Sequence, residues 1–325
     1  MYSDIENSKL QISLVSGIIT SMMQEMALIT NFELTKINII QDKKKKIESL
    51  LSLYDKLTLH KYDVVNNQLS IEAKFGLCNF FYNVKNFDRS LDLIDEIIKS
   101  QPHNTKAIHC KIIIEESSNR LEPAIKSCEK ILRIDNRNTG ILLQKGELLS
   151  KLVRRVEAIE CFDNILNINP RHMLALYNKG VLLSEMTRRE EAIQCFDRVL
   201  AIDTNHVSSW YNKGALLSEV NPQKAIECFD RVLAINPGHM PALYNKGLAY
   251  ESLERINEAI TCYDAVLRMN ENHLPSLFHR GIVLAKLGHV ESAIVSFDHA
   301  LNINPRHMLA LYNKGVLLSE MTRRE

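Results

Sequence analysis

Residues 166–190 read LNINPRHMLALYNKGVLLSEMTRRE, and residues 301–325 repeat these 25 letters without a change. The two copies are 135 positions apart, and weaker copies of the same pattern lie between them. Counted from Met173, successive copies begin 34, 33, 34 and 34 residues apart. A fixed period of this length is typical of stacked structural repeats.

Each period contains two apolar stripes with helical spacing, separated by a short polar break. We therefore expect every repeat to fold as two helices, called helix A and helix B. The pattern predicts an array over 71–325 that ends in a half repeat, 308–325. Its seven full repeats begin at Ile71, Thr105, Thr139, Met173, Val207, Met240 and Leu274. Residues 1–70 do not fit the period and are predicted to form a helical N-terminal cap.

Small residues recur at fixed slots of both helices. Glycine inside a helix costs about 1 kcal/mol relative to alanine, so its recurrence needs a packing reason. We expect the helices to cross closely at these slots, with an aromatic ring of helix B filling the adjacent space. The helix A glycines are Gly146, Gly180, Gly214, Gly247, Gly281 and Gly315, the helix B alanines are Ala124, Ala158, Ala192, Ala225, Ala259 and Ala293, and the rings are Phe162, Phe196, Phe229, Tyr263 and Phe297.

The repeat resembles the tetratricopeptide repeat (TPR) over 71–325. The Val207 copy carries the pattern as Trp210, Gly214, Leu217, Ala225, Phe229 and Pro237. The resemblance implies an all-α, right-handed solenoid in which helix A lines the concave side, and it implies a protein–protein interaction scaffold. The first two copies depart from the pattern, and looser or shifted packing is expected there. The departures are Cys78, Ser90, Ile112 and Glu115.

Two helix A slots outside the packing pattern hold a column of amides beside a column of rings. The amide slot holds Gln144, Asn178, Asn212, Asn245, His279 and Asn313, and the ring slot holds Tyr177, Tyr211, Tyr244, Phe278 and Tyr312. A carboxamide donates and accepts hydrogen bonds, which suits a peptide backbone, and a ring adds apolar area with little entropy loss. A similar asparagine ladder holds peptide backbone in the TPR superhelix of O-linked N-acetylglucosamine transferases. The alternative is that duplication copied these residues without a binding role.

Further helix A positions vary between repeats and are predicted to select the ligand. They are Glu147, Lys151, Glu185, Glu219 and Lys286. Chaperone-binding TPR proteins are similar in fold but hold a C-terminal carboxylate with Lys and Arg side chains. No such clamp is expected here, because the corresponding slots hold Leu174, Tyr177 and Asn178, or Pro275 and His279.

Three other columns follow the period. A basic residue precedes the helix A glycine and an aspartate follows the helix B ring, which suggests a series of ion pairs between helices. These are Lys111, Lys145, Lys179, Lys213, Lys246, Arg280 and Lys314, with Asp163, Asp197, Asp230, Asp264 and Asp298. One histidine per repeat precedes helix A and cannot converge with the others on a metal ion. His172, His206, His239, His273 and His307 are therefore predicted to be loop or cap residues.

The composition argues against several classes of function. A formal net charge of +1 gives no sign of nucleic-acid binding. Four cysteines recur at the repeat period, about 10 Å apart and too far for disulfides, which indicates a reducing compartment and a cytoplasmic protein. They are Cys161, Cys195, Cys228 and Cys262. Residues 12–29 are apolar but interrupted by polar side chains, so a buried helix is expected there, with a membrane span as the alternative. No catalytic motif, cofactor site or metal site is recognised.

The sequence therefore predicts a non-enzymatic scaffold that binds a protein or an extended peptide along the concave face. Two alternatives stay open: the substrate-recruiting arm of a larger enzyme, such as a glycosyltransferase whose catalytic domain lies beyond Glu325, and a self-associating array. The second copy of the opening stretch stops before a helix B. Helix 308–321 is therefore expected to leave Leu311 and Leu318 partly uncovered and to fray or self-associate.

Overall fold

The computed structural model describes residues 71–323, which form fifteen α-helices joined by turns, with no strand in that range. The helices are α5 (Ile71–Asn83), α6 (Phe87–Ser100), α7 (Thr105–Ser117), α8 (Leu121–Ile134), α9 (Thr139–Lys151), α10 (Arg155–Ile168), α11 (Met173–Glu185), α12 (Arg189–Leu200), α13 (Val207–Leu217), α14 (Pro222–Ile235), α15 (Met240–Ser252), α16 (Ile256–Met269), α17 (Leu274–Lys286), α18 (Val290–Ile303) and α19 (Met308–Thr322). The helical cap predicted over 1–70 lies outside the described residues.

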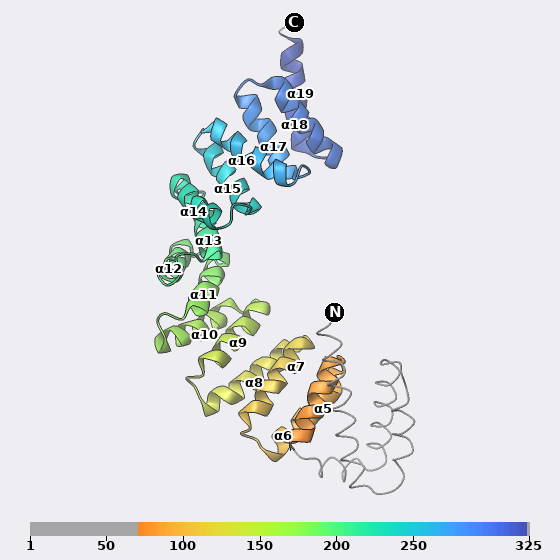
Figure 1. Ribbon diagram of the computed structural model, residues 1–325, viewed down its shortest axis with the longest axis vertical. Helices are drawn as coiled ribbons and strands as arrows, with labels where there is room; N and C mark the ends of the chain where they lie inside the picture. Colours follow the sequence, from red (N-terminus) through yellow and green to blue (C-terminus); the bar gives the residue numbers. More distant parts are fainter. Residues whose placement is uncertain (1–70, 324–325) are drawn as a thin grey trace, which may run out of the picture. The chain divides into compact units, whose positions relative to one another are not determined.

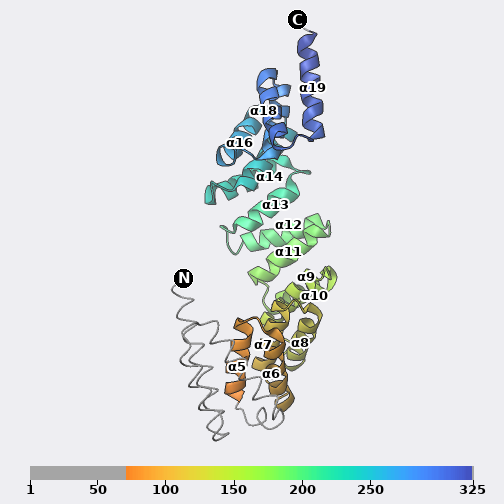
Figure 2. The ribbon, with the colours of Figure 1, turned by 90° about the vertical axis from the view of Figure 1, so that its right-hand side faces the viewer.

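Consecutive helices pack in pairs, as Figure 1 shows for α17 with α18 and Figure 2 for α11 with α12. Within each unit, a pair also contacts the first helix of the next pair, for example α6 with α7 and α14 with α15. The predicted all-α repeat solenoid is confirmed. The chain divides into two compact units, 1–161 and 162–325.

In the second unit, four helix A glycines, Gly180, Gly214, Gly247 and Gly281, face aromatic rings of helix B, whereas Gly315 has no atom near its Cβ position. A Cβ atom placed on Gly180 would lie 2.8 Å from the Phe196 ring, and one placed on Gly281 would lie 2.5 Å from the Phe297 ring. Both rings are fully buried. The glycines therefore make room for the rings, as the recurrence predicted.

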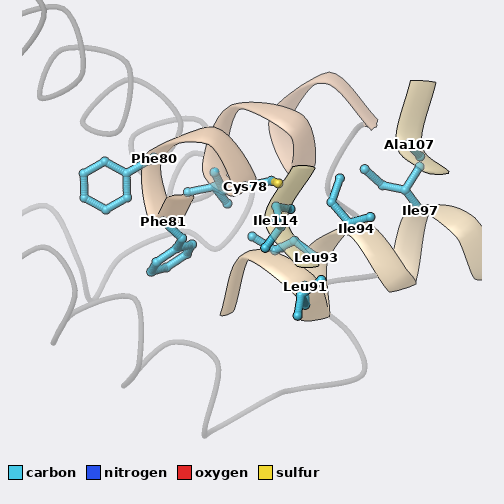
Figure 3. Close-up of a cluster of buried hydrophobic side chains, with 10 residues drawn as sticks. Cys78, Phe80, Phe81, Leu91, Leu93, Ile94, Ile97, Ala107 and Ile114 are labelled. Carbon is cyan, nitrogen blue, oxygen red and sulfur yellow. The ribbon is translucent and has the colours of Figure 1, made fainter. Parts of the chain in front are cut away.

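The first unit keeps a dense core despite its departures from the pattern. Its apolar side chains from α5, α6 and α7 converge in one cluster, shown in Figure 3. Cys78, Ser90, Ile112 and Glu115 are at most 4% exposed, so the expectation of looser packing was wrong. The polar members are paired: the Ser90 hydroxyl donates to the backbone oxygen of Cys78 at 2.8 Å, and the Ser127 hydroxyl donates to the Glu115 carboxylate at 2.8 Å.

Helix A ends in the same type of turn in most repeats. A residue in the left-handed region terminates the helix, and the next residue donates its N–H back to the last turn, as Arg188 does to Leu183 at 2.9 Å. The left-handed residue is Gly288 in one repeat but a side-chain-bearing residue in five others. Those five are Lys85, Asn119, Val153, Thr187 and Glu254.

The periodic histidines are N-caps of helix A, so their prediction as loop or cap residues is confirmed. His172 Nδ1 accepts a hydrogen bond from the backbone N–H of Ala175 at 3.2 Å. His206, His239, His273 and His307 do the same for the N–H three residues on. Asn104 and Asn138 cap α7 and α9 in the same slot. A side-chain acceptor here satisfies an N–H that the helix itself leaves unpaired.

The predicted ion pairs are also present. Each joins helix A to helix B of the preceding repeat, as between Lys213 Nζ and Asp197 Oδ1 at 2.5 Å and between Lys246 Nζ and Asp230 Oδ1 at 2.6 Å. The same slots pair Lys111 with Asp95, Lys145 with Glu129, Lys179 with Asp163, Arg280 with Asp264 and Lys314 with Asp298. The acidic partners are about half exposed, so each pair contributes about 0–1 kcal/mol.

Candidate functional site

The ring column of helix A is seated between two neighbours. Tyr211 lies against the buried Phe229 ring of its own repeat, with ring centroids 6.2 Å apart, and against the capping His239 of the next repeat at 5.2 Å. Tyr177, Tyr244 and Phe278 have equivalent neighbours. All four rings remain partly exposed. Packing fixes each ring from two sides while leaving part of it accessible.

The amide column is connected to the ring column across the repeat boundary. Asn212 Nδ2 donates to the Tyr177 hydroxyl at 3.3 Å, and Asn245 Nδ2 donates to the Tyr211 hydroxyl at 3.1 Å. Asn178 is half-buried in the same slot of α11. We expected the two columns to lie side by side; the hydrogen bond from one repeat to the next was missed. The joint recurrence of Tyr and Asn was the available signal.

Where the ring slot lacks a hydroxyl, the amide turns away. Phe278 occupies the ring slot before Asn313, and Asn313 Nδ2 instead donates to the backbone oxygen of Leu309 in its own helix at 2.7 Å. Tyr312, beside Asn313, is 69% exposed. The amide-to-tyrosine bond therefore links α13 to α11 and α15 to α13, whereas Asn313 of α19 bonds within its own helix.

At two places the amide slot belongs to a charged cluster. His279 Nδ1 lies 3.1 Å from Glu251 Oε2, and the same carboxylate lies 3.6 Å from Lys286 Nζ and accepts from the Tyr263 hydroxyl at 3.0 Å. Burial raises the pKa of Glu251, but the hydrogen bonds from His279 and Tyr263 and the electrostatic interactions with His279 and Lys286 outweigh it and hold that pKa below its usual value. The Glu251 carboxylate is thus kept charged.

The same cluster occurs 135 residues earlier, in the first unit. Gln144 Nε2 donates to Glu116 Oε2 at 3.3 Å, and Lys151 Nζ lies 2.6 Å from Glu116 Oε1. The predicted specificity residues Lys151 and Lys286 are therefore both neutralised by a carboxylate of the preceding helix A. Sequence reasoning missed Glu116 and Glu251, although their spacing equals that of the two identical stretches.

The remaining predicted specificity residues lie at the surface. Glu147 and Glu185 are exposed on α9 and α11. Glu219 lies in the turn after α13, because that helix ends at Leu217, and its carboxylate pairs with the Arg189 guanidinium at 2.6 Å. The structure thus places Glu219 beside the start of α12.

The described residues were compared with the patterns of metal sites and membrane spans. Within 71–323, no three His, Cys, Asp or Glu side chains gather as a metal site, and no helix there is long and apolar enough to cross a membrane. The cysteines of the repeat period are free thiols in the core. Burial raises the pKa of Cys228 and of Cys262 to about 11, which keeps both as unreactive thiols.

Comparison with known proteins identifies the repeat. Models of the tetratricopeptide repeat match residues 175–206, 241–273 and 274–307. No curated protein matches the chain. The chain therefore contains tetratricopeptide repeats.

Solved structures with similar folds include YrrB, described as a TPR protein with an unusual peptide-binding site, at 22% identity and a TM-score of 0.53, covering 58% of this chain and 97% of that one. A TPR protein from Parabacteroides merdae matches with 17% sequence identity and a TM-score of 0.54. The match covers 76% of this chain and 98% of that protein. The C-terminal part of a TPR protein from Cytophaga hutchinsonii matches with 13% sequence identity and a TM-score of 0.64. The match covers 74% of this chain and 98% of that structure. These likenesses show a common fold.

Proposed function

We propose that this chain is a protein-interaction scaffold that binds an extended peptide segment along the ladder of α11, α13 and α15. The observation that carries the proposal is the hydrogen bond from Asn212 and from Asn245 to the tyrosine of the preceding repeat. It uses one N–H of each amide. Within the described residues these two amides have no other hydrogen bond, so a second N–H and the carbonyl oxygen of each are available to a ligand.

An amide held in this way suits a peptide backbone. Every non-proline residue of an extended peptide carries one N–H donor and one C=O acceptor. Neighbouring helices pack about 10 Å apart, whereas an extended chain advances about 3.3 Å per residue. One asparagine per repeat would therefore meet about every third residue of the ligand. The half-exposed rings of Tyr177, Tyr211 and Tyr244 would contact the side chains in between.

The charged cluster around Glu251 would limit the ladder on its C-terminal side. His279 replaces asparagine there and is committed to the Glu251 carboxylate, which also receives the Tyr263 hydroxyl. The peptide would therefore be recognised mainly through its backbone, over three repeats. YrrB, which shares the fold, is described as having a peptide-binding site.

A random library of displayed 12-residue peptides tests the proposal, with the full chain as bait. The best binder is then synthesised and its Kd measured by fluorescence anisotropy against wild type and the Asn212→Ala/Asn245→Ala variant. The matched control is Asn313→Ala, because Asn313 lies in the same slot but bonds to its own helix. We expect at least about tenfold weaker binding by the double variant, equivalent to about 1.4 kcal/mol, and no change in the control. Equal Kd values for all three proteins would refute the ladder as the binding site.

A further inference from the structure

One repeat boundary of the second unit differs from its neighbours at three slots together. The slot of Ser184 and Ser218 holds Glu251 in α15, the ring slot of Phe196 and Phe229 holds Tyr263 in α16, and the amide slot of Asn212 and Asn245 holds His279 in α17. The three replacements contact one another, because the Tyr263 hydroxyl donates to Glu251 Oε2 at 3.0 Å and His279 Nδ1 lies 3.1 Å from the same oxygen. They therefore form a single feature of this boundary.

Packing at this slot does not require a charge. Ser218 holds the slot at the preceding boundary, where its hydroxyl donates to the backbone oxygen of Gly214 at 2.9 Å. The Glu251 side chain is only 15% exposed, and burying a carboxylate is unfavourable unless other groups pair with it. The chain thus places and pairs a charged group where an uncharged one is accommodated one repeat earlier.

The two oxygens of the Glu251 carboxylate have different surroundings. Oε2 is contacted by both Tyr263 and His279. Oε1 receives no hydrogen bond from any described residue, and its ion-pair partner, Lys286 Nζ, lies 3.6 Å away on a side chain that is 54% exposed. Since each carboxylate oxygen has two lone pairs, Oε1 keeps its capacity to accept hydrogen bonds.

The first unit supplies a contrasting carboxylate in the same slot. There, Lys151 Nζ lies 2.6 Å from Glu116 Oε1, and Gln144 Nε2 donates to Glu116 Oε2 at 3.3 Å. Both oxygens of Glu116 are therefore satisfied within the chain. Glu251 differs in having one oxygen that its own lysine approaches only loosely.

Glu251 shares a face of α15 with the ladder residue Tyr244. The two are seven residues apart, which is about two helical turns. The Tyr244 ring lies 5.9 Å from the His279 ring, and burial and the charge of Glu251 raise the pKa of Tyr244. A carboxylate beside an aromatic ring suits a guanidinium or ammonium group, because the carboxylate accepts its hydrogen bonds and the ring face attracts its charge.

We propose that Glu251, His279 and Tyr244 (the Glu251 site) bind an arginine or lysine side chain of the peptide ligand. The cationic group donates to Glu251 Oε1 and lies against the Tyr244 ring, while Lys286 moves into solvent. His279 and Tyr263 position the carboxylate through Oε2. The inference rests on the proposed peptide binding by the ladder, and it adds a position at which a side chain selects the ligand.

Selection from the library with two baits tests whether the site chooses basic residues. Random 12-residue peptides are selected against the full chain as wild type and as Glu251→Gln, which removes the charge but keeps an acceptor for Tyr263. We expect the wild-type binders to share arginine or lysine at one aligned position. The binders of Glu251→Gln should lack this preference.

Binding constants then test the charge itself. The best wild-type binder is synthesised with an acetylated N-terminus, which excludes the terminal amine as the cation. A second form carries citrulline in place of the arginine, or norleucine in place of the lysine. The neutral form should bind wild type at least about tenfold more weakly, and the two forms should bind Glu251→Gln with similar Kd values. Glu116→Gln is the matched control and should behave as wild type.

Removal of Lys286 should have the opposite effect. Lys286 competes with the ligand for Oε1, and its exposed side chain can be replaced without disturbing the fold. Lys286→Met should therefore bind the basic peptide about threefold more tightly and the neutral peptide unchanged. A purely structural role of the pair would leave both affinities unchanged or weaken them. This variant also decides the question if Glu251→Gln does not fold.

The outcomes separate this inference from the proposed ladder. Binders that tolerate Asn212→Ala/Asn245→Ala would refute the ladder, and their response to the neutral residue would still decide the Glu251 site. Failure to recover any binder would refute both. Ladder-dependent binders without a shared basic residue would overturn the Glu251 site alone, as would an equal loss with the neutral peptide in wild type and Glu251→Gln.

Discussion

The side-chain amide of Asn245 donates a hydrogen bond to the hydroxyl of Tyr211, 3.1 Å away and 34 residues earlier in the chain. Asn212 and Tyr177 are joined in the same way at 3.3 Å. These bonds cross from one repeat to the next, so the ladder residues link neighbouring repeats as well as presenting polar groups. A structural role of this kind accounts for the joint recurrence of Tyr and Asn even where no ligand is bound.

Removal of one hydroxyl is expected to weaken this link. Tyr211→Phe should lower the free energy of unfolding by about 0.5–1.5 kcal/mol, since it removes one partner of a half-buried hydrogen bond. A double-mutant cycle with Asn245→Ala, measured by urea denaturation, isolates the pairwise energy. Tyr312→Phe is the control, because Tyr312 is 69% exposed and has no hydrogen-bond partner among the described residues. A coupling energy of zero between positions 211 and 245 would contradict the link.

The same substitution in the two identical stretches should have effects of opposite sign. Gly180→Ala places a methyl group 2.8 Å from the Phe196 ring and should destabilise its repeat by about 1–3 kcal/mol. Gly315→Ala meets nothing and should stabilise α19 by up to about 1 kcal/mol, the helix preference of alanine over glycine. Hydrogen exchange of amides in α11 and α19 measures both. If both substitutions changed stability in the same direction, the glycines would not be needed to make room for the aromatic rings.

A strained turn can be relaxed at Val153. This β-branched residue has φ +62° and is 60% exposed, so it bears the left-handed conformation without burying its side chain. Gly288 holds the same slot in a later repeat. Val153→Gly should raise the free energy of unfolding by about 0.5–1 kcal/mol. The reason is that the relief of about 1–2 kcal/mol of backbone strain exceeds the entropy cost of ordering a glycine. Leu152→Gly, at φ −86°, should instead lower it, and urea denaturation distinguishes the two.

Acid should weaken the cap of α17. His273 Nδ1 accepts from the backbone N–H of Ser276 and lies 2.9 Å from its hydroxyl, with the Tyr244 ring beside it. Burial lowers the pKa of His273 below its usual 6.5. A lowered folded-state pKa means that this stabilisation is present above about pH 6.5 and is lost as the pH falls through the folded-state value.

Replacement by the other natural cap removes the titrating group. Asn104 and Asn138 cap α7 and α9 in the same slot, so His273→Asn should retain the cap without its pH dependence. Melting temperatures of wild type and His273→Asn are compared between pH 7.5 and pH 5. The stability of wild type relative to the variant should fall on acidification. If the melting temperatures of the two proteins changed with pH in parallel, His273 would not be the source of the pH dependence.

The fold was readable from the sequence because its main determinants are local and periodic. Gly180 and Phe196 recur with every repeat, and a helix interior tolerates a repeated glycine only where another side chain needs the room. The core of the first repeats was less readable. There Ser90 and Glu115 are buried through hydrogen bonds to neighbours 12 residues away, and such compensation appears only once the helices are packed.

The candidate site was readable in its residue types but not in its connections. Asn212 and Tyr177 were singled out by their slots, yet which atoms they bond depends on the rotation and stacking of successive repeats. Lys151 and Lys286 illustrate the same point. The sequence predicted them to select a ligand, and the structure pairs them with Glu116 and Glu251 of the preceding helix A.

The proposal that the ladder binds the backbone of the peptide ligand is tested most directly by an N-methyl scan of the best binder from the peptide library. Each backbone N–H of the ligand is replaced in turn by N-methyl, and the Kd for the full chain is measured. If Asn212 and Asn245 each bind one backbone position, affinity should fall at about every third residue, from the ratio of about 10 Å between helices to about 3.3 Å per residue. The losses should vanish in the Asn212→Ala/Asn245→Ala variant. Uniform tolerance of N-methylation, or the same losses in that variant, would contradict the account.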